Sequence, residues 1–174
     1  MQVDFIKTPR LIGERIQRSH GQYWLIIGSN HQVMATMGGV WSEDKARHKM
    51  QSNYEHWQLH GHGQWLFFSQ ENYEFVGRGG IRKVTIDKQK EIELGYALMP
   101  NFWGQGLAVE IGKKALSIAF QEFNYQSVVC YALQNNQRSQ RVMQKIGFLF
   151  EDNILLANRS HVLYRYQNPD LIIS

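Results

Sequence analysis

The chain predicts a single mixed α/β (α+β) domain, mostly β in character, with about four helices. Strand-like and helix-like patterns alternate along all 174 residues, and no internal repeat, low-complexity segment or Pro/Gly-rich linker divides them. Hydrophobic residues make up 43% of the chain and aromatic residues 13%, which is too much for a disordered chain. We therefore expect one domain over residues 1–174, held together by burial rather than by cross-links.

The first half of the chain is expected to contain extended segments and two helices. Residues 10–16 predict a strand, residues 21–27 a short helix, and residues 32–40 a second extended segment. Ser42 is a typical N-cap and Gly61 a typical stop, so a helix is expected between them. The apolar positions of this helix recur near the helical period: Ala46, Met50, Tyr54 and Trp57.

The middle of the chain predicts a hairpin, a further strand and a long helix. Residues 65–69 and 74–86 have the pattern of hairpin partners, and a polar turn leads from them into a strand at residues 91–99. Residues 107–123 predict the helix. Its buried side is expected to hold Ile111, Ala115, Ile118 or Ala119, and Phe123.

The last part of the chain predicts a buried strand, a helix and a closing strand. Residues 128–133 form an apolar run, residues 139–146 predict a helix that ends at Gly147 in a left-handed cap, and residues 158–166 predict the closing strand. The single cysteine, Cys130, lies in the apolar run. An internal disulfide is therefore excluded, and we interpret Cys130 as a small buried hydrophobe rather than a nucleophile.

Charge and hydropathy argue against several classes of partner. The net charge is +4 and the pI about 9.2, but the basic residues are spread along the chain, so we expect no nucleic-acid partner. We recognise no secretory signal and no apolar run long enough to span a bilayer, so we expect no membrane partner and a cytoplasmic location. A homodimer is left open.

Gly104 and Gly106 mark the most informative segment, because a strand-like run ends there and a long helix begins at once. Without a Cβ, these glycines allow a tight turn that leaves backbone N–H groups unpaired at the helix start. Such N–H groups and the helix dipole favour a phosphate. Two known phosphate loops do not fit: Gly106 lies one residue too far from Gly112 for GxxxxGK[ST], and Val109 stands where GxGxxG needs a small residue.

The remaining pattern is a strand, a GxGxA turn and a helix, followed by NNQRSQRVMQKIGF at residues 135–148. It resembles the GNAT superfamily of acyl-CoA-dependent N-acetyltransferases, above all the branch that contains ribosomal-protein N-terminal (RimJ/RimL-like) and antibiotic acetyltransferases. The small residues of its Arg/Gln-x-x-Gly-x-Gly/Ala loop fit in two registers, which begin at Asn101 or at Trp103, and neither residue is Arg or Gln. Further matches to this branch are Thr8-x-Arg10-Leu11 and Glu110.

The resemblance implies a mostly antiparallel sheet whose two central strands, residues 91–99 and 128–133, diverge in a V around the pantetheine arm of acetyl-CoA. Glu93 would be the general base. Ser139 would donate a proton to the departing thiolate, because Met143 stands where many relatives have a tyrosine; Tyr131 and Tyr164 are alternatives. The residues expected to hold coenzyme A are Leu98, Met99, Gly104, Gln105, Gly106, Leu107, Ala108, Val109, Asn136, Ser139, Arg141 and Lys145.

The implied activity is direct transfer of an acetyl group to a primary amine, on a protein N-terminus or a small molecule, without a metal. A non-catalytic acyl-CoA sensor or interaction module is the alternative, supported by the missing Arg/Gln and the missing tyrosine. His56, His60 and His62 are spaced so that their imidazoles could bind zinc, but no cysteine or carboxylate completes the set of ligands. Four aromatic residues suit either a cationic amine or core packing: Tyr23, Trp24, Trp41 and Tyr73.

Overall fold

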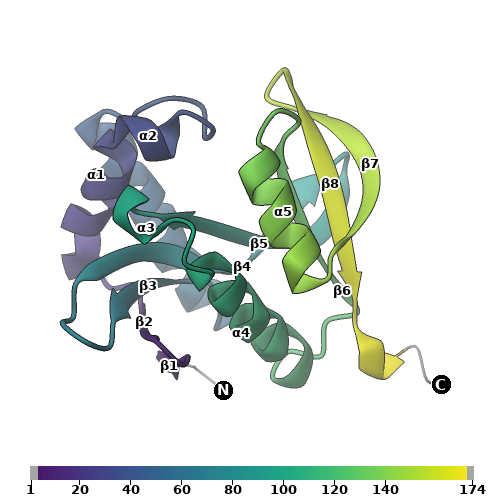
Figure 1. Cartoon of the computed structure of the whole chain (residues 1–174), viewed down its shortest axis with the longest axis horizontal. Coiled ribbons are helices and arrows are strands. Elements are labelled where there is room, and N and C mark those ends of the chain that lie inside the picture. The colour runs from purple at the N-terminus through teal and green to yellow at the C-terminus, as the bar shows by residue number, and fades with distance from the viewer. Residues whose placement is uncertain (1–3, 172–174) are drawn as a thin grey trace.

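The computed structural model describes residues 4–171, which contain one eight-stranded sheet (Figure 1). The strands lie in the order β1-β2-β3-β4-β5-β6-β8-β7, and every neighbouring pair is antiparallel except β5 and β6. The bounds of the strands are β1 Phe5–Lys7, β2 Leu11–Arg15, β3 Gln64–Ser69, β4 Phe75–Ile86, β5 Gln89–Leu98, β6 Ser127–Leu133, β7 Leu149–Leu156 and β8 Arg159–Gln167.

Five α-helices accompany the sheet within residues 4–171, one more than the sequence predicts. The mixed α/β, mostly antiparallel fold is thereby confirmed. In the described part of the chain, no helix is both long and apolar enough to cross a membrane. The helices are α1 Gly21–Ser29, α2 His31–Met34, α3 Glu43–His60, α4 Leu107–Gln121 and α5 Gln137–Ile146, and short 3₁₀ turns cover Arg18–His20, Pro100–Phe102 and Pro169–Leu171.

The additional helix is α2, so the prediction of an extended segment at residues 32–40 is wrong. Asn30 begins this helix, because its side-chain oxygen accepts a hydrogen bond from the backbone N–H of Val33 at 3.0 Å. An apolar pattern over four residues is too short to distinguish a helical turn from a strand. After α2 the chain turns through Gly38 and Gly39, which both have left-handed backbone angles.

Two edge strands, β1 and β7, have no clear sequence signal. β1 is only three residues long. β7 exposes most of its side chains, including Leu149 and Leu155, and has three polar residues at its centre, so it shows neither a buried run nor a regular alternation. Pairing with β8, rather than the pattern of β7 itself, explains why this segment is extended.

Several predicted boundaries are confirmed by the geometry of the helix ends. The Ser42 hydroxyl accepts a hydrogen bond from the backbone N–H of Lys45 at 3.2 Å and so begins α3. Gly61 ends α3 and Gly147 ends α5, both in the left-handed conformation, with φ of +70° and +113°. These signals lie within a few residues of the ends that they mark, and this is why the sequence predicts them well.

The two faces of the central sheet pack against different helices. Gly79 on β4 faces α4, because a Cβ at this position would clash with that helix, and Ile81 packs in the core formed with α4 and α5. We call this side the α4/α5 face; both helices lie in the foreground of Figure 1. Alternation along the strands places Arg78, Arg82 and Glu93 on the opposite side, toward α1 and α3, which we call the Glu93 face.

The two central strands separate after a single point of pairing. β5 and β6 run parallel, and their only paired residues in the described chain are Glu93 and Val129. Beyond this pair the strands diverge, with β1 to β5 on one side and β6, β8 and β7 on the other (Figure 1). The V-shaped splay implied by the resemblance is thereby confirmed.

Cys130 lies on β6, directly after the point of pairing, and is 2% exposed. Burial raises the pKa of its thiol, which opposes formation of the reactive thiolate. The interpretation of Cys130 as a small buried hydrophobe is therefore confirmed.

Candidate active site

The loop between β5 and α4 presents uncapped backbone N–H groups. Gly104 and Gly106 are exposed and have left-handed backbone angles, with φ of +76° and +80°. Gly106 is the N-cap of α4, and no side chain caps this helix end. The first amide groups of α4, from Leu107 to Val109, are therefore available at the positive end of the helix dipole. This arrangement can hold a phosphate group.

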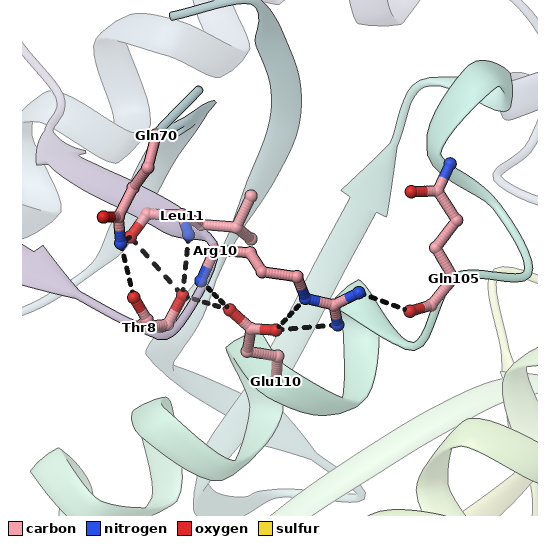
Figure 2. Close-up of polar contacts among 6 residues, drawn as sticks. All are labelled: Thr8, Arg10, Leu11, Gln70, Gln105 and Glu110. Carbon is pink, nitrogen blue, oxygen red and sulfur yellow. Dashed lines mark hydrogen bonds and ion pairs between the residues drawn. The ribbon is translucent and has the colours of Figure 1, made fainter. Parts of the chain in front are cut away.

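Residues near the N-terminus hold this loop against the start of α4 (Figure 2). Glu110, in the first turn of α4, accepts hydrogen bonds from the Thr8 hydroxyl at 2.5 Å and from the backbone N–H of Arg10 at 2.9 Å. The Arg10 guanidinium pairs with Glu110 at 2.8 Å and donates to the carbonyl oxygen of Gln105 at 2.9 Å. We call Thr8, Arg10, Gln105 and Glu110 the Arg10 clamp.

The Arg10 clamp also affects the electrostatics of the loop. Burial alone would raise the pKa of Glu110, but the hydrogen bonds from Thr8 and Arg10 outweigh burial and hold this pKa below its usual value. The Arg10 side chain is half exposed, and its Nη2 lies 3.7 Å from where a Cβ of Gly106 would be. A positive charge therefore lies beside the uncapped amides. In the sequence, Thr8, Arg10 and Glu110 are separate matches to the family resemblance, and nothing there indicates that they contact one another.

The start of α5 contacts the residues that precede the loop. Asn136 caps α5, because its side-chain oxygen accepts a hydrogen bond from the backbone N–H of Ser139 at 3.1 Å. The Arg138 guanidinium lies 4.1 Å from the ring centroid of Trp103, a cation–π contact. The Trp103 indole N–H in turn donates to the carbonyl oxygen of Leu98 at 2.8 Å. These contacts join α5 to the end of β5.

Ser139 contacts a tyrosine, Tyr96, that the sequence did not indicate as a site residue. The hydroxyl oxygens of Ser139 and Tyr96 are 2.8 Å apart, on the α4/α5 face of the splay. Burial raises the pKa of Tyr96, and this keeps its hydroxyl protonated. Tyr96 lies three residues after Glu93 on β5, and period-two alternation could have placed the two on opposite faces. Met143 is fully buried in the core and has no proton to donate.

Glu93 lies on the opposite face of the same strand. Its residue is 8% exposed, and its carboxylate forms an ion pair with Arg82 at 3.0 Å. The alternative of an exposed strand position is therefore wrong. Tyr131 on β6 is close by: burial, and then the charge of Glu93, raise the pKa of its hydroxyl. Glu93 and the Ser139 hydroxyl thus lie on opposite faces of the sheet, close to the point where β5 separates from β6.

The remaining residues predicted to hold coenzyme A divide into two groups. Leu98 is the last residue of β5 and Met99 follows it, so both are close in sequence to the loop. Arg141 and Lys145 are exposed on α5. Lys145 is in the last turn of this helix, about 9 Å further along the axis than Ser139, so the structure does not bring it to the Tyr96–Ser139 pair.

The three histidines lie side by side but do not form a metal centre. The ring centroids of His56 and His62 are 5.4 Å apart, and those of His60 and His62 are 6.0 Å apart. Both ring nitrogens of His62 have partners: the Tyr125 hydroxyl at 2.6 Å and the carbonyl oxygen of Ile81 at 3.3 Å. Among residues 4–171, no group of His, Cys, Asp or Glu side chains has an arrangement that could hold a metal ion.

Comparison with known proteins identifies the family. A model of the Acetyltransferase (GNAT) domain matches residues 10–149, so this chain belongs to the GNAT acetyltransferase family. The uncharacterized protein YkkB of Bacillus subtilis is 24% identical over 161 residues, which are 89% of this chain and 94% of YkkB. An acetyltransferase of Agrobacterium tumefaciens shares the fold with a TM-score of 0.83, at 22% identity over 96% of each chain.

A second solved structure contains coenzyme A. It is RimL, a ribosomal L7/L12 alpha-N-protein acetyltransferase, in complex with coenzyme A; its TM-score is 0.76 at 19% identity, over 94% of this chain and 97% of RimL. Family membership makes this chain an acyl-CoA-dependent N-acetyltransferase, with acetyl-CoA as donor and an amine as acceptor.

Proposed function

We propose that this chain transfers the acetyl group of acetyl-CoA directly to a primary amine while both molecules are bound in one ternary complex. The arrangement at the divergence of β5 and β6 carries this proposal. Glu93 lies on one face of β5, and Tyr96, hydrogen-bonded to Ser139, lies on the other. A thioester between the strands would have a carboxylate on the side from which the amine approaches and two hydroxyl groups on the other.

The chain's own groups suit the phosphates of coenzyme A. Within residues 4–171, no atom beyond Gly104 and its two chain neighbours lies within 4 Å of a Cβ built on Gly104, and the amides at the start of α4 have no side-chain cap. These amides would bind the pyrophosphate, and the Arg10 guanidinium would add positive charge beside them. Asn136, Arg141 and Lys145 are the further residues that we propose for the coenzyme. When bound, acetyl-CoA supplies the activated acetyl group.

Glu93 would act as the general base. An amine must be neutral before it attacks a carbonyl carbon, and a buried carboxylate beside the attack point can accept its proton. Ser139 would donate a proton or a hydrogen bond to the departing thiolate, and its contact with Tyr96 would hold the hydroxyl in place. Holding both substrates in position contributes more to the rate than either proton transfer.

The proposed acceptor is a protein N-terminus or a small-molecule amine. We also propose that residues 1–174 act as one domain, which is supported by the single sheet with strands from Phe5 to Gln167. The activity is tested by release of the coenzyme A thiol from acetyl-CoA with a panel of primary amines. Acetyl-CoA binding without turnover on any amine would favour the non-catalytic sensor instead.

The Glu93→Gln variant tests the base. We expect a rate loss of roughly a hundred-fold or more that is largest at the low-pH end of the profile, with nearly unchanged acetyl-CoA affinity. Glu91→Gln is the matched control, because Glu91 is also an ion-paired carboxylate on β5, held by Arg165 at 2.8 Å. Equal pH–rate profiles for the Glu93→Gln variant and the wild type would remove Glu93 from the mechanism.

A further inference from the structure

Arg78 is a buried cation on the Glu93 face of β4. The residue is 7% exposed. Its guanidinium donates to the side-chain oxygen of Gln64 and lies 4.8 Å from the ring centroid of Trp24. Its Nε is buried without a hydrogen-bond partner, and so is the indole Nε1 of Trp24. The buried guanidinium therefore has an unused donor of its own, and the indole N–H of Trp24 is a second one.

The charges around Arg78 do not balance. Arg82 follows four residues later on the same face, and its Nε is also buried without a hydrogen-bond partner. Glu93, the only carboxylate that forms an ion pair with either arginine in residues 4–171, pairs with Arg82. Lys49 of α3, an exposed residue, adds a third positive charge at the edge of this group, and its pKa is lowered by partial burial and by Arg82, Lys45 and Arg78. One carboxylate thus faces three cations.

A buried guanidinium with no anionic partner is energetically costly, because the charge loses its hydration and gains no opposite charge in return. Burial accordingly lowers the pKa of Arg78 to about 10. The planar fork of a guanidinium matches a carboxylate in two parallel hydrogen bonds, and such pairs are among the strongest in proteins. The environment of Arg78 therefore fits an anionic group that the chain itself does not provide.

The position of Arg78 connects this anion site with the proposed acceptor. Arg82 is directly opposite Glu93 in the β4–β5 ladder, and Arg78 is opposite Ala97, near the diverging end of β5. Arg78 is about 13 Å along β4 from Arg82, and therefore from the position of Glu93. The long side chains can shorten the distance between the charged groups. Because Arg78 is only 7% exposed, a folded protein chain cannot reach its guanidinium, and a partner has to be small.

We propose that the acceptor is a small primary amine that carries a carboxylate, an amino acid in the broad sense. Its carboxylate binds Arg78, with Trp24 Nε1 as a further donor, and its amine lies at Glu93. This inference rests on the proposed function, because it names the substrate class of the same site. The Trp24 ring, which the sequence offers for a cationic amine, is already occupied on one face by Arg78.

The test compares pairs of amines that differ only in charge. Glycine, β-alanine, γ-aminobutyrate and 5-aminovalerate are each assayed against their carboxamides at equal ionic strength, and the chain length of the best acid reports the spacing between the two groups. For at least one pair we expect the acid to have a kcat/KM roughly ten- to a hundred-fold above that of its amide. Acid-to-amide ratios near or below one in all pairs overturn the inference while leaving the acetyltransferase activity standing.

Variants link any preference to Arg78. Arg78→Met is expected to bring the acid-to-amide ratio close to one, and Arg78→Lys, which keeps the charge without the fork, to give an intermediate ratio. Arg47→Met is the control, because Arg47 is an exposed arginine on α3 that pairs with Glu43; its ratio should equal that of the wild type. An unchanged ratio in a folded Arg78→Met variant also overturns the inference.

Failure of the proposed function is detected separately. If no amine of either series is acetylated, calorimetry with the N-acetylated acids and N-acetylated amides measures recognition of the carboxylate without turnover. Binding of the acids alone, lost in Arg78→Met, supports the inference even then. Absence of binding to any of these acids overturns it.

Discussion

Gly106 occupies a backbone conformation, φ +80°, that glycine adopts without strain and other residues rarely adopt. It is also the N-cap of the helix whose amides we propose to bind pyrophosphate. We expect Gly106→Asp to abolish measurable binding of coenzyme A in calorimetry, because a side chain and a negative charge would enter the phosphate site.

Gly39→Asp is the matched control for Gly106→Asp. Gly39 is also left-handed, with φ +88°, and a Cβ built on it has no neighbour within 4 Å among the described residues other than those adjacent in the chain; it lies in the turn after α2. This variant has a similar backbone strain and should retain coenzyme affinity. Retained affinity in a folded Gly106→Asp variant would remove the loop from the coenzyme site.

Ser139 and Tyr96 provide a second comparison between single residues. We expect Ser139→Ala to lower kcat by roughly ten- to a thousand-fold with little change in the KM for acetyl-CoA, because one positioned hydrogen-bond donor is lost. Tyr96→Phe removes the hydroxyl that contacts Ser139 at 2.8 Å and should cause a smaller loss. A greater loss of kcat in Tyr96→Phe than in Ser139→Ala would instead assign proton donation to Tyr96.

At the scale of elements, the Arg10 clamp fastens the β1–β2 turn to the start of α4. Glu110 is the shared acceptor, and its neutral replacement keeps the shape but loses the ion pair with Arg10. We expect Glu110→Gln to weaken coenzyme A binding by roughly ten-fold and to lower the free energy of unfolding by about 1–3 kcal/mol.

Glu122→Gln is the control for Glu110→Gln, because Glu122 is exposed at the opposite end of α4. It should change neither coenzyme affinity nor stability beyond about 0.5 kcal/mol. Wild-type coenzyme affinity in Glu110→Gln would mean that the clamp does not position the phosphate loop.

At the scale of the whole molecule, the histidines link stability to pH. Burial and nearby charges lower the pKa of His56 to about 3 and burial lowers that of His62 to about 4, whereas an unfolded histidine has a pKa near 6.5. Between these values the unfolded chain binds more protons than the folded chain. The stabilising contribution is therefore complete above pH 6.5 and is lost as the pH falls toward 4.

We accordingly expect the Tm to fall by roughly 5 °C between pH 6.5 and pH 5, measured by thermal unfolding at constant ionic strength. His62→Gln should make this dependence less steep. His48→Gln, a change at an exposed position of α3, should leave the slope unchanged. Parallel pH profiles for His62→Gln and the wild type would contradict the role of His62.

The features that the sequence predicts well depend on residues close to one another in the chain. Ser42, Gly61 and Gly147 mark helix ends through contacts within four residues, and the Gly104–Gly106 turn is visible because glycine adopts its left-handed backbone angles without strain. The helical period of α3 and α4 and the alternation of β5 follow from the same local geometry. The fold class and the predicted phosphate loop rest on such signals.

Tertiary structure alone decided the contacts between distant segments. Tyr96 and Ser139 are 43 residues apart, and Arg10 and Glu110 are 100 residues apart. Whether such pairs meet depends on strand order and register, which no short segment specifies. The unpaired charge of Arg78 is likewise invisible in a sequence, because it depends on which carboxylates the folded chain brings near it and on how much water it excludes.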